Sequence, residues 1–240
     1  MDLHLTPQQR LWAIGGLGAA AIGVLVLFLA RTTTFLATVR WSGELPDGVQ
    51  GAVAGISSIG MYALAGIFMV AALSVWTTGA RLPGESEPSR ASGLVLAAVT
   101  GTGVVLAYGI SSGVKALVAQ ARPCQDLAVT TIAECPVPTS FSWPSNHSTI
   151  AVALAVGVWV MSKRWAPLAL LAVPLGIGVA LSRVFVGVHF FHDVLAGALL
   201  GAAVVWAAAR WLAPIVRRLV TRTGLAARTR LVTRTGVDGG

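Results

Sequence analysis

Long apolar stretches separated by short polar segments dominate the pattern of this chain of 240 residues. Six stretches are predicted to form helices that cross a membrane: 11–30, 51–76, 93–115, 148–161, 166–181 and 191–212. About twenty apolar residues cover a hydrocarbon core of roughly 30 Å, at about 1.5 Å per residue. Segments 31–49, 77–92 and 116–146 contain prolines and charges and are expected to be loops. The pattern predicts an all-α fold, a polytopic membrane bundle of about six transmembrane helices.

The composition agrees with a lipid environment. Hydrophobic residues make up 55% of the chain and charged residues 11%, and the mean hydropathy is +0.78. Such a chain has too few charges to cover a water-soluble surface. The net charge of +8 comes from 15 Arg and 2 Lys against 9 acidic residues. In a membrane protein this excess is interpreted by its position between the spans, so no nucleic-acid partner is expected.

The basic residues are unevenly distributed between alternate segments. With the N-terminus inside, the inner segments hold twelve of them: Arg10, Arg81, Arg90, Lys163, Arg164, Arg210, Arg217, Arg218, Arg222, Arg228, Arg230 and Arg234. The outer side holds only Arg31, Arg40, Arg122 and Arg183, with Lys115 at a span end. This bias predicts a multi-pass protein of the cell (plasma or inner) membrane with both termini cytoplasmic. Residues 1–213 are predicted to form the membrane domain and 214–240 a basic cytoplasmic tail.

The polar segment 182–193 places titratable side chains where one apolar stretch ends and the next begins. His189 and Asp193 are four residues apart, so on a helix they share one face. A carboxylate that accepts from one imidazole nitrogen leaves the other with a free lone pair, which favours nucleophilic chemistry. Arg183 adds a planar cation suited to phosphate oxygens. His192 is interpreted as a polar residue at a helix start.

Two more polar clusters are predicted on the same outer face. Lys115 and Arg122 are seven residues apart and would align over two helical turns. Residues 144–147, with the sequence PSNH, open the fourth predicted span. A helix N-terminus offers free N–H groups and a positive dipole end, which suit an anion. Ser145 would add a hydroxyl donor, and His147 a second histidine for acid–base chemistry.

Together the patterns K-x6-RP, PSxH and SR-x5-H-x3-D resemble those of the type 2 phosphatidic acid phosphatase superfamily. These are metal-independent lipid phosphate phosphatases whose site is shared with vanadium haloperoxidases. The resemblance covers about 93–213, and Asn146 stands where many members have Gly. It implies that His189 is a nucleophile forming a phosphohistidine, that Asp193 orients it, and that His147 is the general acid.

The resemblance also implies a phosphate cradle made of four side chains, Lys115, Arg122, Ser145 and Arg183. No metal and no cofactor is expected, because cations can stabilise phosphoryl transfer by themselves. The implied substrate is a lipid phosphate or pyrophosphate at the outer leaflet of a bacterial cell envelope. Polyprenyl pyrophosphate, phosphatidic acid and phosphatidylglycerol phosphate all fit, and the other partners are membrane lipids.

Two alternatives and one pairing stay open at this point. The same phosphohistidine could pass phosphate to an alcohol, as in a phosphotransferase. A catalytically silent lipid-binding or transport protein could keep the fold, although binding alone would not need His147, His189 and Asp193. Cys124 and Cys135 lie in a segment expected to face outward, which favours a disulfide over two free thiols.

Overall fold

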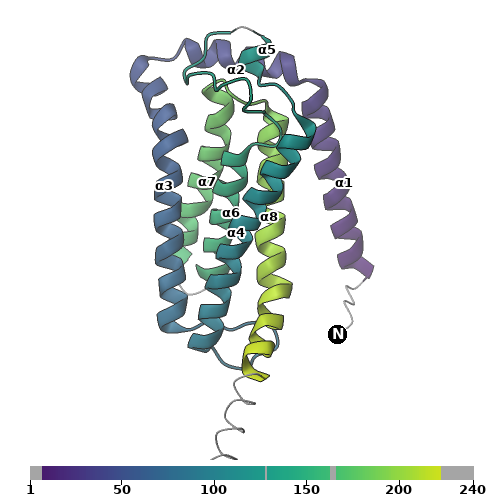
Figure 1. Ribbon diagram of the computed structural model, residues 1–240, viewed down its shortest axis with the longest axis vertical. Helices are drawn as coiled ribbons and strands as arrows, with labels where there is room; N and C mark the ends of the chain where they lie inside the picture. Colours follow the sequence, from purple (N-terminus) through teal and green to yellow (C-terminus); the bar gives the residue numbers. More distant parts are fainter. Residues whose placement is uncertain (1–6, 128, 163–165, 223–240) are drawn as a thin grey trace, which may run out of the picture.

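The computed structural model describes residues 7–127, 129–162 and 166–222, and within these residues it is helical with no β-strand. Five helices run side by side as a bundle (Figure 1): α3 (Asp47–Thr78), α4 (Arg90–Val118), α6 (Asn146–Met161), α7 (Ala166–Phe185) and α8 (Phe191–Ala207). Helix α1 (Pro7–Leu29) lies to one side and packs against α8. The predicted all-α membrane bundle is confirmed.

Each of the six predicted spans forms a helix. Within the described residues, four segments are long and apolar enough to cross a membrane: Asp47–Thr78, Arg90–Asp126, Pro167–Phe185 and Phe191–Arg222. The fifth bundle helix, α6, is apolar but has only 16 residues. It lies among α3, α4, α7 and α8 and packs against all four. A helix that is enclosed by other helices is expected to be apolar on all its faces, and the sequence of α6 has this property.

Helices α6 and α8 approach each other unusually closely at two glycines. A Cβ atom on Gly197 would collide with the carbonyl oxygen of Ser145, and one on Gly201 would collide with that of Thr149. Small residues at such points let the backbones of membrane helices pack directly against each other. This contact places the start of α8 against the start of α6, where the predicted catalytic motifs lie.

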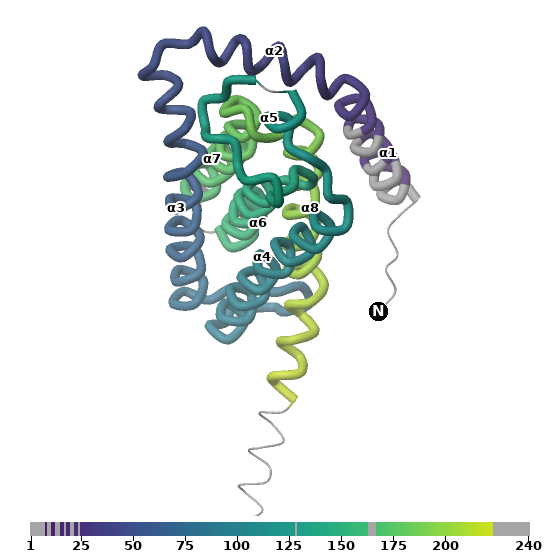
Figure 2. Tube along the Cα trace, turned by 45° about the horizontal axis from the view of Figure 1, so that its top comes forward, coloured from purple at the N-terminus to yellow at the C-terminus, as the bar shows by residue number. Residues whose placement is uncertain are grey.

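The prediction of a loop over 31–49 is wrong for most of the segment. Residues Arg31–Gly43 form helix α2, which runs between α1 and α3 across one end of the bundle (Figure 2). Thr34 Oγ1 donates to the backbone carbonyl four residues earlier at 2.9 Å, so this polar side chain is satisfied by its own helix. Phe35 is fully buried and its ring lies 5.4 Å from that of Phe190.

At the opposite end, α8 continues through the π-helical turn η2 (Ala208–Leu212) and remains helical to Arg222. The predicted boundary between membrane domain and tail therefore falls inside a helix. Arg217 Nε, in the predicted tail, donates to Ser92 Oγ on α4 at 3.1 Å. The rest of the tail lies outside the described residues, as do five basic residues counted for the orientation: Lys163, Arg164, Arg228, Arg230 and Arg234. The division into domain and tail stays a prediction.

Candidate active site

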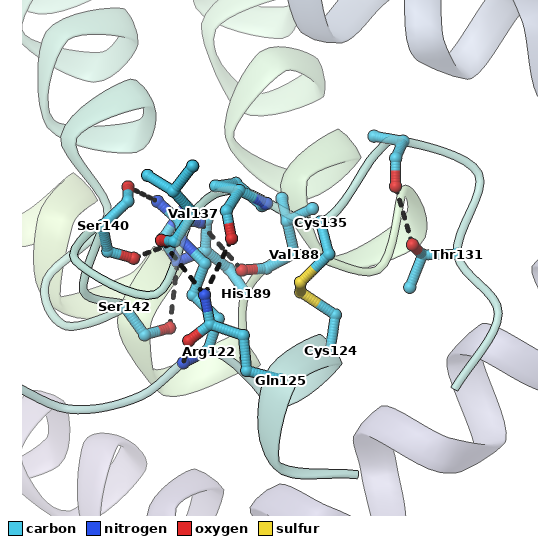
Figure 3. Close-up of a disulfide and its surroundings, with 12 residues drawn as sticks. Arg122, Cys124, Gln125, Thr131, Cys135, Val137, Ser140, Ser142, Val188 and His189 are labelled. Carbon is cyan, nitrogen blue, oxygen red and sulfur yellow. Dashed lines mark hydrogen bonds between the residues drawn. A yellow bond between two sulfur atoms is a disulfide. The ribbon is translucent and has the colours of Figure 1, made fainter. Parts of the chain in front are cut away.

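The predicted motifs meet at the end of the bundle that α2 crosses. The backbone N–H of Ser145, just before α6, donates to the carbonyl of Asp193 in the first turn of α8 at 3.0 Å. The segment between α4 and α6 folds over this junction and brings Arg122 and Ser142 next to His189 (Figure 3). The site therefore combines residues from four separate parts of the chain.

His189 lies between α7 and α8 and is 1% exposed. Its Nε2 atom is 3.0 Å from Arg122 Nη1. A guanidinium carries protons at all pH values relevant to proteins and can only donate, so Nε2 must accept. The proton of the neutral ring is then on Nδ1, which lies 3.3 Å from Asp193 Oδ2. This is the tautomer in which Nε2 holds the lone pair and Asp193 supports the opposite nitrogen.

Asp193 is fully buried and accepts from several donors. Its Oδ2 accepts from the Ser142 hydroxyl and from the backbone N–H of Phe190, the latter at 2.9 Å. Its Oδ1 accepts from Gln120 Nε2 at 3.2 Å and lies 3.0 Å from His192 Nε2. The carboxylate is therefore held in one orientation toward His189.

The environment of His189 keeps its imidazole neutral. Burial lowers the pKa of His189 well below 6.5, and the positive charges of Arg122, Arg183 and Lys115 lower it further, in that order. His147 acts on the ring in the same direction. The three predicted cations and His147 therefore all lie within electrostatic reach of His189. The ring of His189 is unprotonated at neutral pH.

Two of the cations are tied to the same short segment. Lys115 Nζ donates to the carbonyls of Phe141 at 2.9 Å and Ser142 at 3.2 Å. Arg122 Nε donates to the carbonyl of Ser140 at 2.7 Å. Neutral carbonyls orient these cations and leave their positive charge in place.

Arg183, on the last turn of α7, has donors left over. Its Nη1 donates to Ser57 Oγ on α3 at 2.6 Å. Its Nε is buried and has no hydrogen-bond partner among the described residues. A buried donor without a partner is costly, and an oxygen of a bound phosphate would satisfy it. No described carboxylate lies within ion-pair distance of Lys115, Arg122 or Arg183.

The start of α6 holds the other predicted residues. Ser145 is fully buried, and its Oγ caps the helix by accepting from Ser148, at 3.4 Å from the backbone N–H and 3.0 Å from the hydroxyl. A hydrogen bond from Ser145 to phosphate stays a prediction. His147, two residues later, is exposed, and its side chain has no hydrogen bond to another described residue. Burial, and then the positive charges of Arg183, Arg122 and Lys115, lower the pKa of His147 to about 4, so the ring needs the negative charge of a bound phosphate to take up a proton.

Asn146 joins this helix start to α4. Its Oδ1 accepts from Ser111 Oγ at 2.7 Å and its Nδ2 donates to Ser112 Oγ at 3.1 Å. The residue that departs from the family pattern therefore makes two contacts that a glycine could not make.

The loop that carries Arg122 is fixed on its far side. Cys124 and Cys135 form a disulfide, so the pairing left open by the sequence is made (Figure 3). Gln125 Nε2 donates to the carbonyl of Pro136 at 2.8 Å, and its Oε1 accepts from the Arg122 backbone N–H at 3.3 Å. These links hold Arg122 over His189.

Several residues that contact the site have no separate signal in the sequence. Ser142 and Gln120 both bind Asp193, and Ser57 orients Arg183, but each is a lone polar residue without informative spacing. His192 was interpreted as a polar residue at a helix start. It is 1% exposed, contacts Asp193 and packs against the ring of Phe28, with ring centroids 5.1 Å apart.

The fold is similar to that of a solved membrane protein, the transmembrane PAP2-type phosphatidylglycerolphosphate phosphatase from Bacillus subtilis. The TM-score is 0.55, with 21% sequence identity, over 79% of this chain and 92% of that chain. At this identity the likeness shows the fold alone.

Two curated proteins are similar in sequence. An undecaprenyl-diphosphatase from Sulfolobus acidocaldarius is 38% identical over 98 residues, which is 41% of this chain and 46% of that protein. A decaprenylphosphoryl-5-phosphoribose phosphatase from Mycobacterium tuberculosis is 36% identical over 108 residues, which is 44% of this chain and 55% of that protein. The chain thus spans about half the length of the curated relatives that it matches.

The family model described as the PAP2 superfamily matches residues 93–217, which include all seven predicted site residues. This is more than half of the chain. With its long apolar helices and the fold that it shares with a transmembrane protein, the chain is a multi-pass membrane protein. It belongs to the PAP2 superfamily.

Proposed function

We propose that this protein is a phosphatase that removes phosphate from a lipid phosphate or pyrophosphate, through a phosphohistidine formed on His189. The observation that carries the proposal is the pairing of the neutral, buried His189 with Arg122 and Asp193 on opposite ring nitrogens. A nucleophile needs the free lone pair on Nε2, and this arrangement supplies it. The uncompensated charges of Lys115 and Arg183 would attract the phosphate.

In the first step, a phosphate oxygen accepts the Arg122 N–H that donates to His189 Nε2 in the structure without substrate. The lone pair of Nε2 then attacks phosphorus, and the bond from phosphorus to the lipid oxygen breaks. His147 gives a proton to the leaving oxygen. The ring of His189 becomes positively charged as the N–P bond forms, and Asp193 stabilises that charge through Nδ1–H. The three cations offset the charge on the phosphoryl oxygens.

In the second step, water attacks the phosphorus of the phosphohistidine. His147, now neutral, accepts a proton from that water as the N–P bond breaks. The electron pair of the bond returns to Nε2, and inorganic phosphate leaves. Both histidines are then in their starting states, so the cycle closes without a metal ion or cofactor.

The relatives suggest which lipid is used. Both curated proteins carry polyprenyl lipids in their names, an undecaprenyl diphosphate and a decaprenylphosphoryl sugar phosphate. We therefore place polyprenyl pyrophosphate first among the candidate substrates, ahead of phosphatidic acid and phosphatidylglycerol phosphate. The Cys124–Cys135 disulfide next to the site supports an extracytoplasmic position, because disulfides persist in oxidising compartments.

Phosphate release by the purified protein tests the proposal. The three lipids are each incubated with the wild type, with His189→Ala and with Arg40→Gln, all in the presence of a chelator. Arg40 is an exposed cation on α2, so its loss controls for a general change of charge. Release by the wild type and Arg40→Gln, but not by His189→Ala, is expected.

Two results would contradict the proposal in different ways. Lipid binding without release from any substrate would identify a silent binding protein. Transfer of the phosphoryl group to an added alcohol, in preference to water, would identify a phosphotransferase that uses the same intermediate.

A further inference from the structure

A cavity of about 540 Å³ lies at the end of the bundle opposite His189. It is formed by the end of α3, the connection from α3 to α4, the end of α6, and α8 with its π-helical turn. In Figure 1 this is the lower end, where α3 and α4 are joined. Its volume falls in the usual range for small-molecule and cofactor sites. None of the predicted catalytic residues lines it.

Two arginines line this cavity, and both have unused donors. Arg81 and Arg210 are exposed, and neither has a hydrogen bond or an ion pair with another described residue. Other arginines at the same end are engaged, since Arg90 Nε donates to the carbonyl of Thr77 at 3.1 Å and Arg217 lies 3.4 Å from a carboxylate. A guanidinium with free donors suits the oxygens of a phosphate.

The rest of the lining is largely apolar. Val75 and Met161 contribute side chains that are buried in the bundle. Trp159 and Trp206 line the cavity while remaining 61% and 48% exposed. Tryptophan is enriched where hydrocarbon meets water in membranes. Arginines next to apolar and aromatic surface match a molecule with an anionic head and a hydrocarbon chain.

The π-helical turn begins two residues after Trp206 and carries Arg210, both of which line the cavity, whereas Trp211 in the same turn does not. Trp206 and Trp211 are five residues apart and would point about 140° away from each other on a regular α-helix. Their ring centroids nevertheless lie 5.3 Å apart, because the turn Ala208–Leu212 shifts the register. The same turn holds Arg210 at the cavity. Single π turns within α-helices are frequent at functional sites.

We propose that this cavity binds an anionic phospholipid of the leaflet opposite the catalytic site. The phosphate lies against Arg81 and Arg210, and an acyl chain lies against Trp159 and Trp206. The chain's own C-terminal segment 223–240 is a poorer occupant, because its sequence has three arginines and one aspartate and would repel the two guanidiniums. This inference is independent of the reaction proposed for His189.

Native mass spectrometry of the full-length protein in detergent tests the site. Phosphatidylglycerol and phosphatidylcholine with identical acyl chains are titrated separately. We expect phosphatidylglycerol to bind about tenfold more tightly than phosphatidylcholine. Arg81→Gln/Arg210→Gln should abolish this preference. Arg222→Gln, an exposed cation at the same end but outside the cavity lining, should keep it. Equal binding of the two lipids, or an unchanged preference in the double variant, would overturn the proposal.

Further experiments distinguish the contribution of the lipid headgroup from that of the acyl chain, and control for misfolding of the variants. Deacylated glycerophosphoglycerol should fail to displace the bound lipid, and Trp159→Ala should weaken binding without removing the preference for an anionic head. Displacement by the soluble headgroup at matched concentration would contradict the part assigned to the tryptophans. Arg81→Lys/Arg210→Lys keeps both charges and should retain most of the preference. Its loss in this conservative variant would show that charge is not the cause.

Discussion

The guanidinium of Arg122 lies 3.0 Å from Nε2 of His189, the nitrogen proposed to attack phosphorus. Without substrate this contact fixes the ring tautomer. In the proposed reaction, the same N–H would bind a phosphate oxygen, and the lone pair would be released when phosphorus arrives. Arg122 would then connect substrate binding to the reactivity of the nucleophile.

Replacing Arg122 with Gln is predicted to change both the rate and its pH dependence. Burial and the charge of Arg122 lower the pKa of His189 below 6.5, so neutral, reactive imidazole is lost only as the pH falls through that lowered value. Without the cation, the acid limb of the pH profile of kcat/KM should shift to higher pH, toward 6.5. Removal of one charge-stabilising donor also typically costs about 10²–10³ in kcat.

The measurement is kcat/KM for an aryl phosphate between about pH 4.5 and 8, since this parameter reports the free enzyme. Arg40→Gln serves as the matched control and should leave the limb in place. The ionisation of the substrate is common to all variants and cancels in the comparison. An acid limb that stays fixed in Arg122→Gln would remove Arg122 from the account of the nucleophile.

The disulfide is predicted to act on the same arginine. Cys124→Ala/Cys135→Ala should destabilise the loop by about 3 kcal/mol in the chain-entropy account, and should lower activity because Arg122 is then held less firmly. In an Arg122→Gln background, loss of the disulfide should change activity little further. If loss of the disulfide lowers activity as much in the Arg122→Gln background as in the wild type, the disulfide acts on the site independently of Arg122.

The sequence predicts some parts of this architecture well and others poorly. The contact between His189 and Asp193 was expected from their four-residue spacing on a helix. The contact is made, but His189 lies before α8, which begins at Phe191, so it is the turn into α8 that brings the two side chains together. The loop expected over 31–49 rests on the charges and the proline of that segment. Pro46 lies after the end of α2 at Gly43, and arginine is compatible with a helix, so neither feature excludes α2. Gln120 and Ser142 could not be found, since their contact with Asp193 depends on how the segment between α4 and α6 folds over the site.

Activity is predicted to survive EDTA and to be inhibited by vanadate. Within the described residues no group of three or more His, Cys, Asp or Glu is placed to hold a metal ion. Lys115, Arg122 and Arg183 should supply the charge stabilisation, and vanadate resembles the five-coordinate phosphoryl group that they would bind. The check is phosphate release with each addition. A strict requirement for added magnesium would contradict this mechanism.

The orientation in the membrane is predicted from the basic residues and can be tested with single cysteines. Ser86→Cys, in the exposed connection between α3 and α4, should resist an impermeant thiol reagent in intact cells. Thr130→Cys, exposed near the catalytic end, should react. The native cysteines are bonded to each other and should contribute little background. The reverse pattern of labelling would place the catalytic end in the cytoplasm.

The most direct test of the central claim is the burst of nitrophenolate released from an aryl phosphate before the steady state. Nitrophenolate leaves readily without a proton, whereas acid assistance to a poor leaving group is typically worth about 10²–10⁴ in rate. His147→Ala should therefore keep most of the burst, while His189→Ala, which lacks the nucleophile, should show none. An equal loss of the burst in the two variants would contradict the roles assigned to His147 and His189.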